Sequence, residues 1–80
     1  MKTFNAYYRV AARKNGGTAA EWKTTDSIEA FKFFKDYVET YREANEMFRK
    51  TNPNENPYII TLDVVDADSE MFVEIKREDV

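Results

Sequence analysis

Between residues 26 and 50, apolar residues recur every three or four positions, the spacing that stacks side chains on one face of a helix. We therefore expect a helix over about residues 27–50. Asp26 is a preferred N-cap residue, and Glu29 three positions later completes the pattern of a capping box. Pro53 disfavours helical geometry at Asn52, so the helix should end before it.

Two apolar stripes run side by side along this expected helix. The first comprises Ile28, Phe31, Phe34, Val38, Tyr41 and Phe48, and the second comprises Ala30, Phe33, Tyr37, Thr40, Ala44 and Met47. We favour a sheet wide enough to cover both stripes. The alternative is that the sheet covers only the first stripe, so that Phe33, Tyr37 and Met47 face a partner or a second copy of the chain.

Outside the helix, apolar and polar residues alternate with the period of two that is typical of half-buried strands. Strands are expected over about residues 4–14, 18–24, 58–65 and 70–77, with Asn15-Gly16-Gly17 as a tight hairpin turn between the first two. The inward sets are Phe4, Ala6, Tyr8, Val10 and Ala12; Ala20 and Trp22; Tyr58, Ile60, Leu62 and Val64; and Met71, Val73 and Ile75.

The element order is therefore strand, strand, helix, strand, strand. The simplest arrangement that buries these faces is a single two-layer α+β domain over residues 1–80. In it, one long helix lies across one face of a four-stranded, mainly antiparallel sheet.

Composition excludes several kinds of chemistry. The chain has no cysteine and no histidine, which removes the usual zinc ligands and the nucleophilic devices that depend on histidine. The carboxylates of Asp66, Asp68 and Glu70 lack the glycine and distal glutamate of a calcium-binding loop. We expect no enzymatic activity, no cofactor and no metal. The chain also lacks an apolar segment typical of a signal peptide or a membrane span, so we expect a cytoplasmic protein without membrane contact.

Charge is unevenly distributed along the chain. Residues 1–25 carry a net charge of +4, residues 26–51 of −1 and residues 52–80 of −6. We favour an arrangement in which the basic and acidic segments are neighbours in the sheet and neutralise one another. The alternative is a dipolar surface that steers a partner.

The leading functional hypothesis is a small acidic, non-enzymatic, protein-binding module. Its carboxylates would present an acidic strip to a basic, nucleic-acid-binding groove of a larger partner: Asp63, Asp66, Asp68, Glu70, Glu74, Glu78 and Asp79. No stretch matches a family motif. In size, acidity and lack of cysteine the chain resembles the inhibitors that phages and mobile elements direct at host nucleic-acid machinery, including anti-CRISPR and anti-restriction proteins. That resemblance implies an antagonist that acts by occupying a surface.

Two other classes of function stay open. Aromatic and basic residues share the outward face of the expected sheet and could stack single-stranded bases: Tyr7, Arg9, Arg13, Lys23, Phe72 and Lys76. The third class is a structural or self-associating domain, a homodimer formed through Phe33, Tyr37 and Met47.

Overall fold

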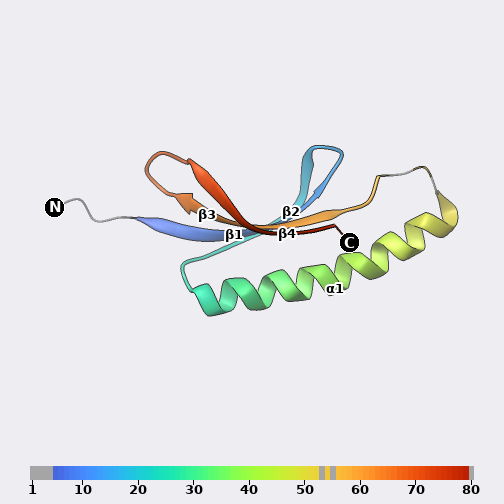
Figure 1. The fold of residues 1–80 in the computed structure, drawn as a ribbon, viewed down its shortest axis with the longest axis horizontal. Helices are drawn as coiled ribbons and strands as arrows, with labels where there is room; N and C mark the ends of the chain where they lie inside the picture. The colour runs from blue at the N-terminus through green and yellow to red at the C-terminus, as the bar shows by residue number, and fades with distance from the viewer. Residues whose placement is uncertain (1–4, 53, 55, 80) are drawn as a thin grey trace.

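A computed structural model describes residues 5–52, 54 and 56–79 of the chain. The elements are β1 (Ala6–Lys14), β2 (Gly17–Thr24), α1 (Ser27–Thr51), β3 (Ile59–Asp66) and β4 (Phe72–Asp79) (Figure 1). The strands form one antiparallel sheet in the order β2-β1-β3-β4, and α1 packs on one of its faces. This confirms the predicted fold class. Phe4, predicted in the first strand, and Pro53, predicted to follow the end of the helix, lie outside the described residues.

The start of α1 is fixed by Asp26. Its side-chain Oδ1 accepts hydrogen bonds from the backbone N–H groups of Ile28 at 2.9 Å and Glu29 at 3.3 Å. The expected return contact from the Glu29 side chain is absent from the hydrogen bonds of the described residues. Instead, the backbone N–H of Asp26 donates to Thr24 Oγ1 at 3.1 Å. The cap is therefore tied to the end of β2 rather than closed within the helix.

The core lies between α1 and the central strands. Its fully buried members are Val10, Ala12, Ala30, Phe34, Ile60 and Leu62, and residues of both helical stripes pack around them. Phe33 and Tyr37, from the second stripe, are half-buried against this core. The sheet therefore covers both stripes in the middle of the helix, as favoured from the sequence. The helix overhangs at its ends, where Ile28 is 81% exposed and Met47 is 71% exposed.

The return of the chain from α1 to β3 is held by a buried amide. Asn45 is 3% exposed. Its Oδ1 accepts from the backbone N–H of Tyr58 at 2.9 Å, and its Nδ2 donates to the carbonyl of Tyr58 at 3.5 Å. A polar side chain is tolerated at this depth because its hydrogen-bonding groups have partners. The sequence analysis did not single out Asn45.

The prediction for β4 was wrong in its burial. Met71, Val73 and Ile75 were expected in the core, yet they are 75%, 65% and 43% exposed, and all eight residues of β4 are exposed. The physical reason is width. A helix with its side chains is about 10–12 Å across and strands lie about 4.8 Å apart, so one helix covers two or three strands and not four. Accordingly, α1 packs mainly against β1, β3 and β2.

The sheet face predicted for Lys76 of β4 was also wrong. Leu62 pairs with Lys76 but Asp63 pairs with Glu74, so Ile75 is an extra residue in a β-bulge. Lys76 was expected to point away from the helix. It points towards it instead, with its Nζ 5.6 Å from the centre of the Phe31 ring. The strand also continues to Asp79, two residues beyond its predicted end at about residue 77.

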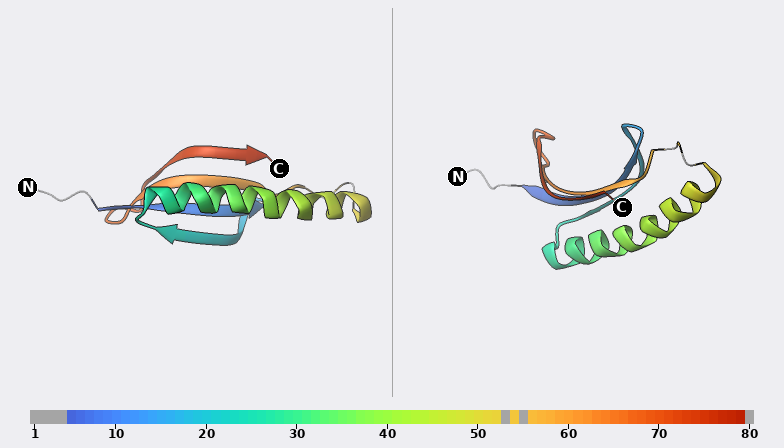
Figure 2. Two further views of the ribbon diagram at one scale, coloured as in Figure 1. Left: turned by 90° about the horizontal axis from the view of Figure 1, so that it is seen from below. Right: turned by 45° about the vertical axis from the view of Figure 1, so that its right-hand side comes forward.

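The sheet curves, and both of its hairpins bend away from α1 (Figure 2). The face turned away from the helix, called the outer face below, is therefore concave. Two bulges, one in each hairpin, contribute to this bend because a bulge locally increases strand twist. The β1–β2 turn has the predicted tight geometry, since Asn15 and Gly16 both have positive φ, 55° and 79°. Over the described residues, no helix is long and apolar enough to cross a membrane.

Candidate functional site

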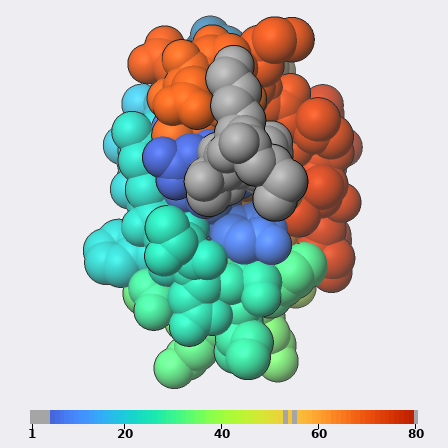
Figure 3. Space-filling view, turned by 90° about the vertical axis from the view of Figure 1, so that its left-hand side faces the viewer, coloured from blue at the N-terminus to red at the C-terminus, as the bar shows by residue number. Residues whose placement is uncertain are grey.

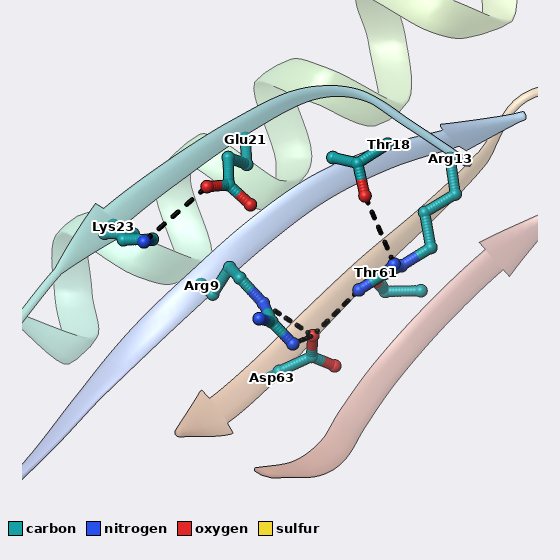
Figure 4. A network of polar contacts seen from close by, with 7 residues as sticks. All are labelled: Arg9, Arg13, Thr18, Glu21, Lys23, Thr61 and Asp63. Atoms are coloured by element: carbon teal, nitrogen blue, oxygen red, sulfur yellow. Dashed lines mark hydrogen bonds and ion pairs between the residues drawn. The ribbon is translucent and has the colours of Figure 1, made fainter. Parts of the chain in front are cut away.

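The centre of the outer face is an ion-pair network around Asp63 (Figure 4). Asp63 is 1% exposed and stands opposite Arg9 in the β1–β3 ladder. Its Oδ2 accepts from Arg9 Nη2 at 2.9 Å and from Arg9 Nε at 3.2 Å, and Arg13 Nη2 lies 3.5 Å away. The basic N-terminal segment and the acidic C-terminal segment are thus neighbours in the sheet, as favoured from their charges. Asp63 is covered by its partners and does not belong to an exposed acidic strip.

Arg13 ties three strands together. Its Nε donates to Thr61 Oγ1 of β3 at 3.3 Å, and its Nη1 donates to Thr18 Oγ1 of β2 at 3.4 Å. Together with its ion pair to Asp63, these bonds fix the guanidinium in one place on the floor of the outer face (Figure 4). The network is a cross-brace of the sheet, because it links β2, β1 and β3 through side chains as well as through the ladder.

The structure brings the residues proposed for base stacking together, but with cations over their rings. The Arg9 guanidinium carbon lies 4.8 Å from the centre of the Phe72 ring, and Lys23 Nζ lies 5.7 Å from the centre of the Tyr7 ring. These are cation–π distances. The ring of Phe72 is therefore occupied by Arg9, and the ring of Tyr7 by Lys23. Lys76, also proposed for this face, lies on the helix side.

Beside this network the outer face has an open hollow of about 260 Å³ near the β1–β2 turn. Its lining mixes both charges with apolar groups and includes Arg13, Thr61, Asp63, Phe72, Glu74 and Arg77. The mixture gives the hollow no strong preference for an anion or a cation. Glu74, predicted to belong to the acidic strip, lines this hollow rather than the turn.

Three of the seven residues of the predicted acidic strip, Asp66, Asp68 and Glu70, gather in the β3–β4 turn. Asp66 Oδ1 accepts from the backbone N–H of Asp68 at 2.9 Å, and Ser69 Oγ accepts from the backbone N–H of Met71 at 3.3 Å. Side chains of this kind form turns by bonding their own backbone. Glu70 has a positive φ of 61°, which turns its backbone sharply into β4. Asp68 and Glu70 are exposed, so the turn presents carboxylates at the end of the hairpin.

Directly after this turn come exposed apolar residues, of which Met71 and Val73 were predicted in the core and Phe72 on the outward face. Met71, Phe72 and Val73 are consecutive and are 75%, 55% and 65% exposed. Figure 3 shows the turn, in orange, meeting β4, in red, along one side of the molecule. We call residues 66–73 the hairpin tip. It combines carboxylates, which were predicted from the sequence, with uncovered apolar side chains. The sequence signal for the exposure of those apolar side chains is the lack of a second helix to cover β4.

The predicted helix site is divided by the fold. Phe33 stacks on Trp22 of β2 with ring centres 4.6 Å apart, and Tyr37 lies against Tyr41 at 5.8 Å. Met47 is exposed farther along α1, beside a hollow of about 330 Å³ that it lines with Ala44, Phe48 and Thr51. The three residues therefore do not form one continuous surface. Their role in partner binding stays a prediction.

An aromatic cluster not foreseen from the sequence closes the other end of the core. Tyr41 and Tyr58 have ring centres 4.7 Å apart, and Lys14 Nζ lies 4.3 Å from the centre of the Phe48 ring. Burial raises the pKa of Tyr41, and the neighbouring Tyr37 and Tyr58 raise it further. The cluster joins the far end of α1 to the start of β3.

Comparisons of the chain with protein-family models, with curated proteins and with solved structures give no match. Within the part of the chain that the structure describes, no group of three or more carboxylate, histidine or cysteine side chains is placed to hold a metal ion.

Proposed function

We propose that this chain is a non-enzymatic, protein-binding module that engages its partner through the hairpin tip, residues 66–73. The observation that carries the proposal is the exposure of Met71, Phe72 and Val73 next to the carboxylates of Asp68 and Glu70. Protein interfaces typically have an apolar centre with a polar rim, and a few large apolar anchors supply most of the binding energy. Uncovered apolar residues in a row are otherwise a liability for a small protein.

The charges of the tip indicate the kind of partner. Asp66, Asp68 and Glu70 place negative charge on the turn side of the apolar residues, which favours a partner surface with an apolar part and a basic part beside it. Nucleic-acid-binding grooves are basic because they neutralise phosphates. We therefore propose that the module occupies such a groove on a larger nucleic-acid-processing complex and antagonises it. In size and acidity the chain resembles the inhibitors of phages and mobile elements, so we propose an anti-defence role of that kind.

The outer face gives less support to direct binding of single-stranded nucleic acid. Such binding needs free cations for the backbone and free aromatic faces for the bases. Arg9 and Arg13 instead hold the buried carboxylate of Asp63, and cations lie over the rings of Phe72 and Tyr7. Protein binding through Met71, Val73 and the carboxylates of the hairpin tip requires no rearrangement of this network, since only Phe72 belongs to both.

A capture experiment with matched charge reversals tests the proposal. Immobilised wild type, Asp66→Lys/Asp68→Lys and Asp36→Lys/Glu43→Lys are each exposed to a bacterial lysate. The second variant carries the same charge change on the exposed side of α1. We expect wild type and the helix variant to recover the same proteins, and the turn variant to lose them.

Two results would count against the proposal. If the turn variant recovers the same proteins as wild type, the hairpin tip is not the binding surface. If nuclease treatment of the lysate abolishes capture by wild type, the chain binds nucleic acid rather than protein. Circular dichroism on each variant separates a loss of binding from a loss of fold.

A further inference from the structure

The edge of the sheet at β4 is open along its length. β4 is the last strand in the order β2-β1-β3-β4, and all of its residues are exposed. An edge strand presents backbone N–H and C=O groups that can pair with another strand. The opposite edge, β2, is covered on its helix side, where Trp22 stacks on Phe33. This contact leaves the backbone edge of β2 open as well, so the choice of β4 rests on the charges of that strand.

The bulge at Ile75 places two opposite charges on the same face of this edge. Glu74 pairs with Asp63 and Arg77 pairs with Thr61 in the ladder with β3, and all four line the hollow on the outer face. In a regular strand, residues three positions apart point to opposite faces. The extra residue in the bulge corrects this, so that Glu74 and Arg77 point to the same side.

We infer that a second copy of this chain pairs with β4 in antiparallel fashion, about a two-fold axis between Ile75 and Lys76. Directly opposite residues of an antiparallel pair point to the same face. In this register Glu74 of each copy lies opposite Arg77 of the other, which gives two symmetric ion pairs on the outer face. The two sheets join into one sheet of eight strands with both helices on the same side.

The charges favour this register over the one shifted by two residues towards the end of β4. A pairing shifted so that Glu74 meets Asp79 of the other copy also sets Lys76 opposite Arg77, and directly opposed like charges are destabilising. In the inferred register Val73 and Ile75, which are 65% and 43% exposed, both lie within the paired segment. Pairing therefore removes apolar surface from water as well as matching charge.

The inferred dimer goes beyond the proposed function and does not depend on it. In the register described, Phe72 lies opposite Asp79 of the other copy, so the ladder ends where the turn begins. Phe72 and Val73 of the hairpin tip belong to the paired segment, whereas Met71 and the carboxylates of Asp66, Asp68 and Glu70 lie past its end and stay accessible to a different partner. The two proposals can therefore fail separately.

Sedimentation equilibrium of the full chain over a wide range of concentrations, with a charge swap, tests the dimer. We expect a monomer–dimer equilibrium for wild type. Glu74→Arg and Arg77→Glu each set like charges against one another at both symmetric positions and should weaken dimerisation at least about tenfold. The double variant Glu74→Arg/Arg77→Glu restores opposite charges and should dimerise like wild type. Glu70→Arg, in the turn, is the matched control and should not change the equilibrium.

A monomer at every concentration would overturn the inference, as would single variants that dimerise like wild type or a double variant that fails to recover. Amide hydrogen exchange on wild type gives a second reading that needs no variant. Amides of β4 should exchange more slowly as protein concentration rises, whereas amides of β2 should not. Exchange in β4 that is independent of concentration would also overturn the inference.

Discussion

The two hairpins of this sheet have similar sequence patterns and opposite surroundings. In the first, both strands lie over the helix, and Ala20 and Trp22 of β2 contact it or the core as their alternation predicts. In the second, β3 is the most buried strand of the sheet and β4 is exposed throughout. This difference shows that the alternation of apolar and polar residues determines which side chains share a face of the sheet. Whether those side chains are buried depends on what covers that face. One helix over four strands leaves one strand uncovered.

The sharpest test of this contrast is the same substitution in each half of the second hairpin. Ile60→Ala in β3 removes a fully buried side chain and should lower the free energy of unfolding by about 2–5 kcal/mol. Ile75→Ala in β4 changes a side chain that is 43% exposed and should cost less than about 1 kcal/mol. Urea denaturation of the two variants measures both values. Equal losses would mean that β4 belongs to the core after all.

The next largest difference in stability is expected between two paired carboxylates on the outer face, Asp63 and Glu74. Asp63→Ala leaves the guanidinium groups of Arg9 and Arg13 without their shared acceptor and should cost about 3 kcal/mol, at the low end for buried pairs because the arginines keep some exposure. Glu74→Ala, opposite Asp63 in β4, should change stability by no more than about 0.5 kcal/mol. Chemical denaturation compares them. If the two substitutions cost the same, the network around Asp63 is not the brace described here.

A smaller difference is expected between the connections that lead into β3 and β4. Asn45→Ala removes both hydrogen bonds to the buried backbone of Tyr58 and should lower the free energy of unfolding by about 1–3 kcal/mol. Ser69→Ala removes one exposed bond to the backbone of Met71 and should cost about 0.5 kcal/mol or less. Thermal unfolding ranks the two. A larger loss of stability for Ser69→Ala would show that the β3–β4 turn, rather than the hydrogen bonds between Asn45 and Tyr58, holds the hairpin in place.

The last prediction is a pH dependence that arises where α1 packs on the sheet and not at β4, because β4 carries no tyrosine. The pKa of Tyr41 is raised in the folded protein by burial and by Tyr37 and Tyr58, above an unfolded value of about 10. Below that pH the phenol is neutral in both states and its contribution is fully present. As pH rises past it the unfolded chain ionises first, so the free energy of unfolding falls. Urea titrations between neutral and alkaline pH should show a smaller fall for Tyr41→Phe than for wild type, and identical curves would contradict the assignment.

The sequence predicted what depends on local chemistry. The N-cap at Asp26, the Asn15-Gly16 turn and the facing of β1 and β3 all follow from spacing and residue type within a few positions. The pairing of the basic and acidic segments could also be foreseen, because opposite charges on adjacent strands are stabilising.

What the sequence could not predict depends on distant parts of the chain. Neither the bulge at Ile75 nor the pairing of Asn45 with Tyr58 has a signal within its own segment. The exposure of Met71 and Val73 follows from the width of one helix relative to four strands, which no local pattern contains. The candidate site was therefore only partly predicted, since the acidic turn and the outward facing of Phe72 were foreseen whereas Met71 and Val73 were placed in the core.

The central claim is that the hairpin tip is uncovered because it binds a partner protein. Hydrogen–deuterium exchange on the complex recovered by wild type, compared with the free chain, tests this claim most directly. If the hairpin tip is the binding surface, binding slows amide exchange chiefly in residues 66–73 and leaves exchange on the exposed side of α1 unchanged. Slowing confined to α1, with residues 66–73 exchanging as in the free chain, would contradict it.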